Sequence, residues 1–278
     1  MRPSYRIAIA SHDRAETLAT KTLPALQRGG IDLCLVDVWT TIDELGTYDA
    51  ALPPEVWLRP EAKLGRAEAR NAIARGYPQG QRLVQVDDDI ERIVQLACEC
   101  RYEDAEHLNE HFEWAFRQAD ELGFGLWGID NGGGRFPKYK RFGATTRMRW
   151  VAGGLFGYTL AGDECDFVHN DDREDDERTL RCGLRDGGVL MLEYLALKTN
   201  TYTEPGGMQN QRTDKLVIRD ANYLLENWPE HLTPVKRSDG RVRPQINLHR
   251  RYAADKTLIP GPDWAHPSTC ERCADVAA

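Results

Sequence analysis

Residues 82–90 read Arg-Leu-Val-Gln-Val-Asp-Asp-Asp-Ile, a short apolar run that leads directly into three consecutive carboxylates. The apolar, β-branched run predicts a buried strand over 82–86. Adjacent carboxylates repel one another and destabilise a fold unless a cation or hydrogen-bond donors compensate. Mg²⁺ and Mn²⁺ prefer oxygen ligands and complete their shells with phosphate oxygens and water. The segment therefore predicts a strand that ends at a divalent-metal site; the plainer alternative is a solvated acidic turn.

The three carboxylates are expected to have different roles. Successive side chains of a strand point to opposite faces, so continued alternation would send Asp87 and Asp89 to the same side. We expect both to reach one metal ion, with Asp87 also able to contact a nucleotide held by that ion. Asp88 would face the other way, and we assign it to the nucleotide rather than to the metal.

Strand-like and helix-like segments alternate along the first third of the chain. The strands are expected at 5–10, 32–38, 55–58 and 82–86, and the helices at 13–26 and 65–75. This alternation predicts an α/β fold with a doubly wound, mostly parallel sheet. Such sheets bind ligands at the carboxyl ends of their strands. Ser11, Asp37 and the acidic triplet would lie at the carboxyl ends of predicted strands and so gather at one edge.

The remainder of the chain shows weaker patterns. Helices are expected at 104–122, after Arg173 and at 214–227, and a glycine-containing strand at 151–158. The stretch 229–267 is rich in proline and lacks a period. We therefore divide the chain into a main domain, residues 1–228, and an irregular C-terminal extension, residues 229–278, packed on its core.

The composition fits a globular protein with a substantial core: 278 residues, 41% hydrophobic and 29% charged. No apolar run approaches the length of a membrane span, and the N-terminus lacks the pattern of a signal peptide. We expect a cytoplasmic protein without a membrane partner. The net charge of −8 is not the default for a nucleic-acid binder. Most of the seven cysteines are scattered, which favours free thiols, although Cys270 and Cys273 could form half of a zinc site.

A second acidic cluster spans residues 163–177. Its nine carboxylates are Asp163, Glu164, Asp166, Asp171, Asp172, Glu174, Asp175, Asp176 and Glu177. Many are expected to be solvated charges at a helix N-terminus, where the helix dipole favours them. One could instead serve as a general base that takes a proton from a hydroxyl group.

In their order along the chain, these segments resemble the GT-A glycosyltransferase superfamily. The resembling segments are residues 9–14, residues 64–71, the triplet 87–89 as a D-x-D motif, residues 174–181, and His249 as a C-terminal metal-binding histidine. The resemblance implies a Rossmann-like GT-A fold and a hexosyltransferase that uses a nucleotide-diphospho-sugar and Mn²⁺ or Mg²⁺.

The resemblance also implies roles for single residues. The donor contacts that it implies are Ser11, Arg14 and Asp37 on the nucleoside, and Gly65, Arg66 and Arg70 on the diphosphate, where arginine matches phosphate geometry. Asp87 would contact the ribose or the metal, and Asp89 and His249 would be metal ligands. Asp175 would be the catalytic base of an inverting reaction, with Glu174 beside it.

Within the superfamily, the chain resembles the phage-borne TET/JBP-associated glycosyltransferases. The residues that carry this narrower resemblance are the acidic triplet, Gly153-Gly154, Glu174-Asp175 and the segment 199–209. It implies transfer of a sugar, from UDP-glucose or a similar donor, to a hydroxymethylated pyrimidine in phage DNA.

Two basic clusters bear on this acceptor. They are Arg135, Lys138, Lys140, Arg141, Arg147 and Arg149, with Phe136, Tyr139, Phe142 and Trp150 interleaved, and then Lys236, Arg237, Arg241, Arg243, Arg250 and Arg251. Basic side chains with aromatic rings suit phosphate contact and base stacking, and a base in a duplex would have to be flipped out. Alternatively, these residues bind the donor diphosphate or pair with the acids of 163–177.

Three other functions stay open at this point. The same chemistry could act on a protein, glycan or small-molecule acceptor. A nucleotidyltransferase also places carboxylates and metal beside a parallel sheet, and would release pyrophosphate rather than a nucleoside diphosphate. A non-catalytic binding module would release neither.

Overall fold

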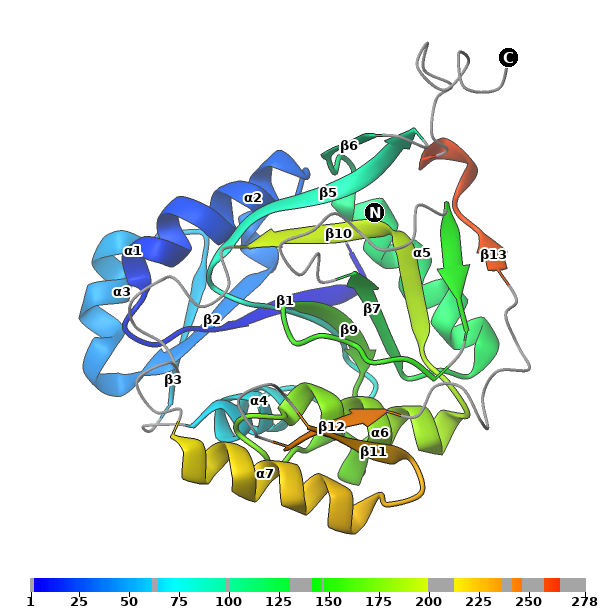
Figure 1. The fold of residues 1–278 in the computed structure, drawn as a ribbon. Helices are drawn as coiled ribbons and strands as arrows, with labels where there is room; N and C mark the ends of the chain where they lie inside the picture. The colour runs from blue at the N-terminus through cyan, green and yellow to red at the C-terminus, as the bar shows by residue number, and fades with distance from the viewer. Residues whose placement is uncertain are drawn as a thin grey trace.

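The computed structural model describes residues 3–61, 65–98, 101–130, 142–146, 148–199, 213–236, 242–246 and 258–265. A large central sheet is covered by helices on both faces (Figure 1). The predicted α/β class with a doubly wound sheet is therefore confirmed. No helix in the described ranges has the length and apolar character needed to cross a membrane.

The central sheet has 11 strands among the described residues, in the order β13-β8-β10-β7-β9-β4-β1-β2-β3, with β5 paired to β10 and β6. The strands are β1 (Tyr5–Ala10), β2 (Val36–Thr41), β3 (Trp57–Glu61), β4 (Arg82–Val86), β5 (Ile90–Cys98), β6 (Arg101–Asp104), β7 (Leu126–Asp130), β8 (Gly143–Thr145), β9 (Leu155–Thr159), β10 (Leu190–Thr199) and β13 (Leu258–Pro260). A separate two-stranded sheet pairs β11 (Leu232–Lys236) with β12 (Val242–Ile246).

Strand direction determines where a ligand can bind. Strands β1, β2, β3 and β4 run parallel to one another, as the alternation predicts. Strand β9 runs antiparallel to both β4 and β7, so β7 points the same way as β4. The carboxyl ends of β1, β2, β3, β4 and β7 therefore lie at one edge of the sheet, which is where open α/β sheets bind ligands.

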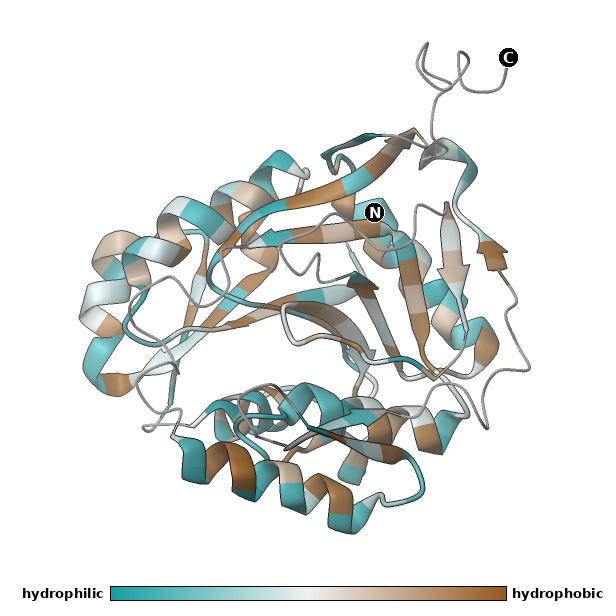
Figure 2. Cartoon of the chain, viewed as in Figure 1, coloured by the Kyte–Doolittle hydropathy of each residue, from teal (hydrophilic) through white to brown (hydrophobic). Residues whose placement is uncertain are grey.

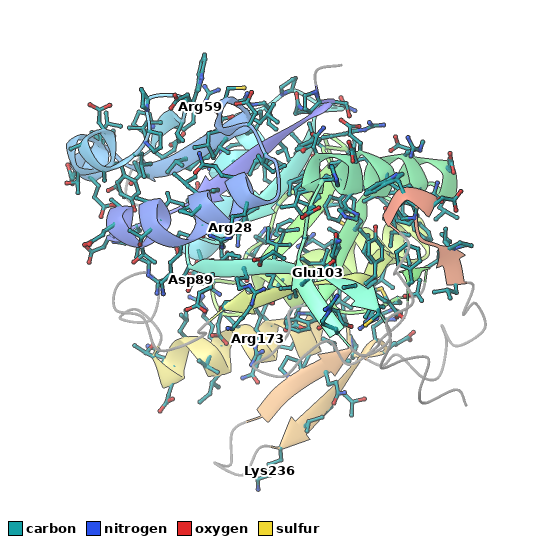
Figure 3. All side chains as sticks on the ribbon, turned by 90° about the horizontal axis from the view of Figure 1, so that it is seen from above. Arg28, Arg59, Asp89, Glu103, Arg173 and Lys236 are labelled. Atoms are coloured by element: carbon teal, nitrogen blue, oxygen red, sulfur yellow. The ribbon has the colours of Figure 1, made fainter. Side chains whose placement is uncertain are left out.

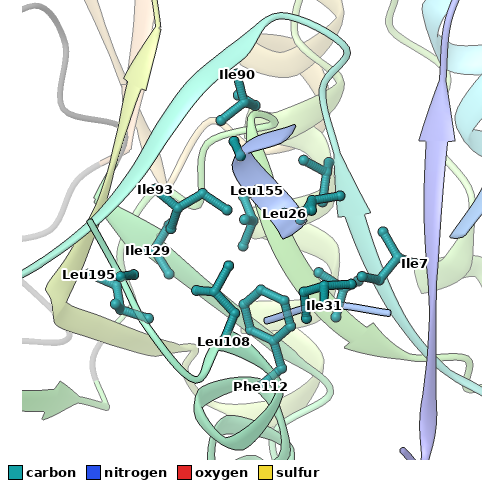
Figure 4. Close-up of a cluster of buried hydrophobic side chains, with 14 of the residues drawn as sticks. Ile7, Leu26, Ile31, Ile90, Ile93, Leu108, Phe112, Ile129, Leu155 and Leu195 are labelled. Atoms are coloured by element: carbon teal, nitrogen blue, oxygen red, sulfur yellow. The ribbon is translucent and has the colours of Figure 1, made fainter. Parts of the chain in front are cut away.

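The helices form two layers around this sheet. They are α1 (Ala15–Thr17), α2 (Leu23–Arg28), α3 (Leu45–Ala51), α4 (Arg66–Arg75), α5 (Leu108–Leu122), α6 (Glu174–Asp186) and α7 (Asp214–Asn227), with a π-helical stretch, Leu18–Thr22, joining α1 to α2. Buried side chains of α1, α2, α3 and α5 form the core on one face, which includes Leu26, Leu108 and Phe112 (Figure 4). Those of α4 and α6 form a second core on the other face.

Local composition explains the central strands and the ends of the helices. Leu83, Val84 and Val86 are fully buried in β4, as expected of a strand covered on both faces. Figure 2 shows the central strands largely hydrophobic, whereas hydrophilic and hydrophobic bands alternate along the outer helices. Helix α6 ends at Gly187, whose φ of 81° lies in the left-handed region that glycine adopts without steric cost.

Strand β2 begins later than the apolar run suggests. Residues Leu33–Leu35 form a 3-10 turn, capped by the Asp32 side chain, which accepts a hydrogen bond from the Cys34 backbone N–H. Because β2 starts only at Val36, Asp37 is its second residue and lies near the amino end of the strand. The prediction that Asp37 lies at the carboxyl end of a strand, at the ligand-binding edge, is therefore wrong.

Other elements differ from the prediction in extent. Helix α5 begins at Leu108 rather than near 104, because Arg101–Asp104 forms strand β6. The expected strand at 151–158 is shorter, with β9 starting at Leu155. In the C-terminal extension, β11 and β12 pair with each other, and β13 joins the central sheet by pairing with β8.

Candidate active site

The residues Asp87, Asp88 and Asp89, called the acidic turn below, connect the end of β4 to the start of β5 at the ligand-binding edge. The Asp87 backbone N–H donates to the Gly154 carbonyl over 2.9 Å. The Thr22 hydroxyl donates to the Asp87 carbonyl and accepts from the Ile90 backbone N–H, each at 2.9 Å. Thr22 is the last residue of the π-helical stretch, a feature that recurs at functional sites.

Arg14 forms ion pairs with two carboxylates of the acidic turn. Its NH1 lies 3.0 Å from Asp88 Oδ1 and 3.2 Å from Asp89 Oδ2. Asp88 also accepts a 2.7 Å hydrogen bond from the Ser11 hydroxyl, which in turn lies 2.7 Å from the Tyr48 hydroxyl. These contacts occupy the buried Ser11 side chain, which the resemblance assigned to the nucleoside.

The acidic turn does not continue the alternation of β4. The strand ends at Val86, and the next residues form a turn in which Asp88 and Asp89 share Arg14 while Asp87 contacts Arg70. The prediction that Asp87 and Asp89 point to one side through strand alternation is therefore wrong.

Arg70 joins the acidic turn to the neighbouring elements. Projecting from α4, its guanidinium donates to Gln85 over 2.9 Å, to Asp87 over 2.8 Å and to the Gly153 carbonyl over 3.1 Å. The Arg70 side chain is 6% exposed, whereas that of Asp87 is 43% exposed. Arg70 is thus a fixed, buried cation, and Asp87 keeps an accessible carboxylate surface.

Glu174, the first residue of α6, is buried among three arginines. Arg66, Arg70 and Arg178 approach its carboxylate to 3.9, 3.6 and 4.0 Å. Burial alone would raise the pKa of Glu174, but the three guanidinium groups outweigh it and lower the pKa. A Cβ on Gly153 would lie 2.9 Å from Glu174 Oε1, so this glycine makes room for the buried carboxylate.

The pKa of Asp175 is shifted in the opposite direction to that of Glu174. Burial and the neighbouring Glu174 carboxylate raise its pKa to about 6, against the lowering effect of Arg178 and Arg66. One carboxylate oxygen accepts a 2.9 Å hydrogen bond from the Asp176 backbone N–H. A partly buried carboxyl group with a pKa close to working pH is suited to general-base catalysis.

The acidic turn offers carboxylate oxygens, the ligand type that a divalent cation prefers. Burial, Asp87 and Asp88 raise the pKa of Asp89 to about 6, while Arg14 opposes them. Among the described residues, the three carboxylates form ion pairs with two arginines, Arg14 and Arg70, and Arg70 is shared with Glu174. In the described ranges, no group of three or more His, Cys, Asp or Glu side chains could hold a metal ion by itself. A nucleotide phosphate and water would have to supply the other ligands, as is usual for Mg²⁺.

Some predicted site residues lie elsewhere. The Asp37 carboxylate is fully buried, 2.7 Å from Arg6 and 3.6 Å from Arg59, and accepts a hydrogen bond from Tyr77. Figure 3 shows Arg59 well separated from Asp89, which agrees with this placement of Asp37.

Gly65 does precede α4, but a Cβ there would lie 2.7 Å from Asp171 Oδ1, which gives the glycine a packing role. His249, Cys270 and Cys273 lie outside the described residues.

The basic clusters are described only in part. Residues 135–141 and Arg147 lie outside the described ranges, as do Arg237, Arg241, Arg250 and Arg251. Arg149 is mostly buried and lies 2.7 Å from Glu193 of β10, an acid outside the cluster 163–177 that the alternative interpretation named. Lys236 is exposed at the end of β11 (Figure 3).

Four contributing residues have no local sequence signal that would reveal them. Thr22 ends the π-helical stretch, Tyr48 lies in α3, Gln85 lies in β4, and Arg178 lies one turn after Glu174 in α6. Each acts through a contact with the acidic turn, with Ser11, with Arg70 or with Glu174. Those contacts exist only once the chain has folded.

Comparison with known proteins supports the fold. No protein-family model and no curated protein matches this chain. The mannosyltransferase PcManGT from Pyrobaculum calidifontis, solved with GDP-Man and Mn²⁺, is similar in structure, with a TM-score of 0.52, 15% identity, and coverage of 83% of this chain and 64% of that one. This likeness confirms a GT-A-like fold.

Two further solved structures match at lower similarity. S. aureus TarS 1-349 has a TM-score of 0.47 and 14% identity, with coverage of 69% of this chain and 60% of that one. A putative nucleotide-diphospho-sugar transferase from Desulfovibrio desulfuricans G20 has a TM-score of 0.43 and 12% identity, with coverage of 82% and 99%. The chain thus spans less than two thirds of the length of TarS 1-349 and PcManGT.

Proposed function

We propose that the protein is a glycosyltransferase that uses a nucleotide-diphospho-sugar. The observation that carries this proposal is the acidic turn, which lies at the carboxyl end of β4 in a GT-A-like sheet and contacts Arg14 and Arg70. Through Arg70 and Glu174, the same network reaches Asp175. Carboxylates for a metal, arginines for a diphosphate and a carboxyl group with a raised pKa are what sugar transfer requires.

The donor diphosphate is proposed to bind between the acidic turn and the N-terminus of α4. Arg66, the first residue of this ten-residue helix, has a side chain that is 44% exposed, and helix N-termini attract phosphate through their free N–H groups and dipole. PcManGT was solved with GDP-Man and Mn²⁺, which supports a nucleotide-sugar and a divalent metal here in general terms. UDP-glucose or a similar UDP-sugar is our proposed donor.

Asp87 and Asp89 are the residues proposed to hold Mn²⁺ or Mg²⁺, with His249 as a further candidate. When bound, the cation would neutralise charge on the departing nucleoside diphosphate. Arg66 and Arg70 would add positive charge from α4. Because Arg70 is fixed by Gln85 and Gly153, it would also keep Asp87 in place during the reaction.

Asp175 is proposed as the base of an inverting transfer. The acceptor hydroxyl oxygen forms a bond to the anomeric carbon of the sugar while the bond from that carbon to the phosphate oxygen breaks. The electron pair leaves with the nucleoside diphosphate, and the hydroxyl proton moves to the Asp175 carboxylate. Glu174 acts on Asp175 through its negative charge, which helps to raise the pKa of the base.

The proposed acceptor is a hydroxymethylated pyrimidine in phage DNA, and the proposed site of action is the host cytoplasm. This rests on the resemblance to the TET/JBP-associated enzymes and on the basic clusters. A protein, glycan or small molecule is the alternative acceptor. A nucleotidyltransferase remains the alternative reaction.

A product assay separates these alternatives. In one set of incubations the protein receives Mn²⁺ and a panel of nucleotide-sugars, and release of nucleoside diphosphate is measured. In a second set it receives Mn²⁺, nucleoside triphosphates and sugar 1-phosphates, and release of pyrophosphate is measured. We expect nucleoside diphosphate, and its loss in Asp89→Ala but not in Asp49→Ala, a control at an exposed position on α3. Pyrophosphate release would identify a nucleotidyltransferase, and retained turnover in Asp89→Ala would remove the metal assignment. Nucleoside mass analysis of hydroxymethylcytosine DNA after the reaction tests the acceptor, since no added hexose across the donor panel would exclude it.

A further inference from the structure

We propose that Arg14 is an internal counter-cation that occupies Asp89 until a nucleoside diphosphate arrives, so that metal binding and nucleotide binding are coupled. This inference rests on the proposed function and deepens it, because it concerns how the acidic turn accepts its metal.

The geometry places Arg14 where a cation is needed. A single guanidinium nitrogen lies 3.0 Å from Asp88 and 3.2 Å from Asp89, and the three side chains are 8%, 9% and 17% exposed. Charge-assisted hydrogen bonds at this distance and burial are strong. Before any ligand binds, the acidic turn is thus already partly neutralised, and a metal ion gains less by approaching it.

The two carboxylates are not held equally. Asp88 has a second donor, the Ser11 hydroxyl at 2.7 Å, which is itself backed by Tyr48. Asp89 is the more exposed of the two, and its contact with Arg14 is the longer one. Asp89 can therefore exchange Arg14 for a metal ion while Asp88 keeps Arg14 attached to the turn.

The backbone of Arg14 is fixed, so the exchange needs only a movement of its side chain. Its N–H donates to the Tyr48 hydroxyl over 3.3 Å, and its carbonyl accepts from the Leu18 N–H over 2.9 Å. A diphosphate offers a guanidinium group new oxygen partners and offers a metal ion additional ligands. Nucleotide binding would thus release Asp89 and raise metal affinity.

Coupling of this kind is reciprocal. If a nucleoside diphosphate raises the affinity for Mn²⁺, Mn²⁺ must raise the affinity for the nucleotide by the same factor. Such coupling between two sites commonly changes an affinity by a factor on the order of 5 to 150. Removing Arg14 should strengthen Mn²⁺ binding to the nucleotide-free protein, because Asp88 and Asp89 lose their counter-charge. The factor by which the nucleotide raises the affinity for Mn²⁺ should then be smaller than in the wild type.

The experiment measures Mn²⁺ binding rather than turnover. Free Mn²⁺ is quantified by electron paramagnetic resonance in titrations of the full-length protein, with and without UDP or GDP. Wild type should bind Mn²⁺ weakly alone and more tightly with a nucleotide. Arg14→Gln should bind Mn²⁺ alone about tenfold more tightly than wild type and show a correspondingly smaller nucleotide effect.

Two further variants keep the test decisive. Arg28→Gln removes the same charge from a side chain that contacts the Glu91 carbonyl, and should leave both affinities unchanged. Arg14→Lys retains a positive charge but lacks the planar guanidinium fork, and should fall between wild type and Arg14→Gln; it replaces Arg14→Gln if that variant does not fold.

Unchanged Mn²⁺ affinity in the folded Arg14 variants would overturn the inference while the proposed function stands. Absence of Mn²⁺ binding to wild type with either nucleotide would overturn both.

Discussion

Replacing Asp175 with asparagine is expected to stabilise the protein and inactivate it at the same time. The pKa of Asp175 in the folded chain is about 6 against an ordinary value of 3.8, because burial and Glu174 disfavour its charged form. This difference corresponds to about 3 kcal/mol of folding free energy, which partial exposure reduces to about 2 kcal/mol. Asparagine keeps an oxygen for the Asp176 N–H and carries no charge.

The size of this stabilising effect depends on pH. A carboxyl group whose pKa is raised on folding destabilises the folded state fully above its folded pKa, and has no such effect below its unfolded pKa. The gain from Asp175→Asn should therefore be largest above about pH 6 and should vanish as the pH falls to about 4. Activity should fall by about 10²- to 10⁴-fold, the usual contribution of a general base.

Glu174→Gln is the matched comparison, one residue earlier in α6. The pKa of Glu174 is lowered, since its arginines outweigh burial, so its charge stabilises the fold. Removing that charge takes the Glu174 carboxylate away from Arg66, Arg70 and Arg178, although Arg70 keeps Asp87. Loss of one partner of a buried ion pair costs about 3–5 kcal/mol. The two neighbouring substitutions should shift stability in opposite directions.

Urea unfolding at pH 8 and pH 5, followed by circular dichroism, measures both variants against wild type. Stabilisation by Asp175→Asn at pH 8 that shrinks at pH 5 would support the charge balance described here. Destabilisation by Asp175→Asn at pH 8, or full activity in that variant, would refute the reasoning about Asp175.

Three further predictions concern the same network. Gly153→Ala places a methyl group 2.9 Å from Glu174 Oε1 and should lower the free energy of unfolding in urea by about 1–3 kcal/mol and remove most of the activity. Gly46→Ala is the control, because a Cβ there meets open space, and it should change neither stability nor activity. Thr22→Val removes the hydroxyl that joins Asp87 to Ile90, and should destabilise the fold by about 1–3 kcal/mol and slow donor turnover. Thr22→Ser keeps the hydroxyl and should stay close to wild type. Equal stability and turnover in the valine and serine variants would argue against this role of the hydroxyl. With saturating Mn²⁺, kcat/KM should decline below about pH 6 as Asp175 is protonated, and a profile flat down to about pH 4.5 would place the base elsewhere.

Features encoded by neighbouring residues could be predicted from the sequence. Strand β4 and the turn after it follow from an apolar run and three carboxylates, and helices α4 and α6 begin where Gly65 and Arg173 suggest. Strand β5 was not predicted, because Glu91 and Arg92 interrupt its apolar pattern. The start of β2 was misjudged because a 3-10 turn and a strand share one apolar run, and this error misplaced Asp37.

The partners within the site could not be predicted from the sequence, because they are far apart along the chain. Arg14 and Asp88 are separated by 74 positions, and the Gly153 carbonyl lies 83 positions from Arg70. Which arginine contacts which carboxylate depends on how the order of the strands brings these distant segments together. The chemical types at the site were predictable, whereas their pairing required the fold.

The most direct test of the donor site is a crystal structure of the protein with UDP and Mn²⁺. We predict the metal on Asp89, with Asp87 and diphosphate oxygens nearby, at the carboxyl ends of β1 and β4, and a diphosphate facing Arg66 and Arg70. A nucleotide bound at another edge of the sheet, or a metal held without Asp87 and Asp89, would contradict the account.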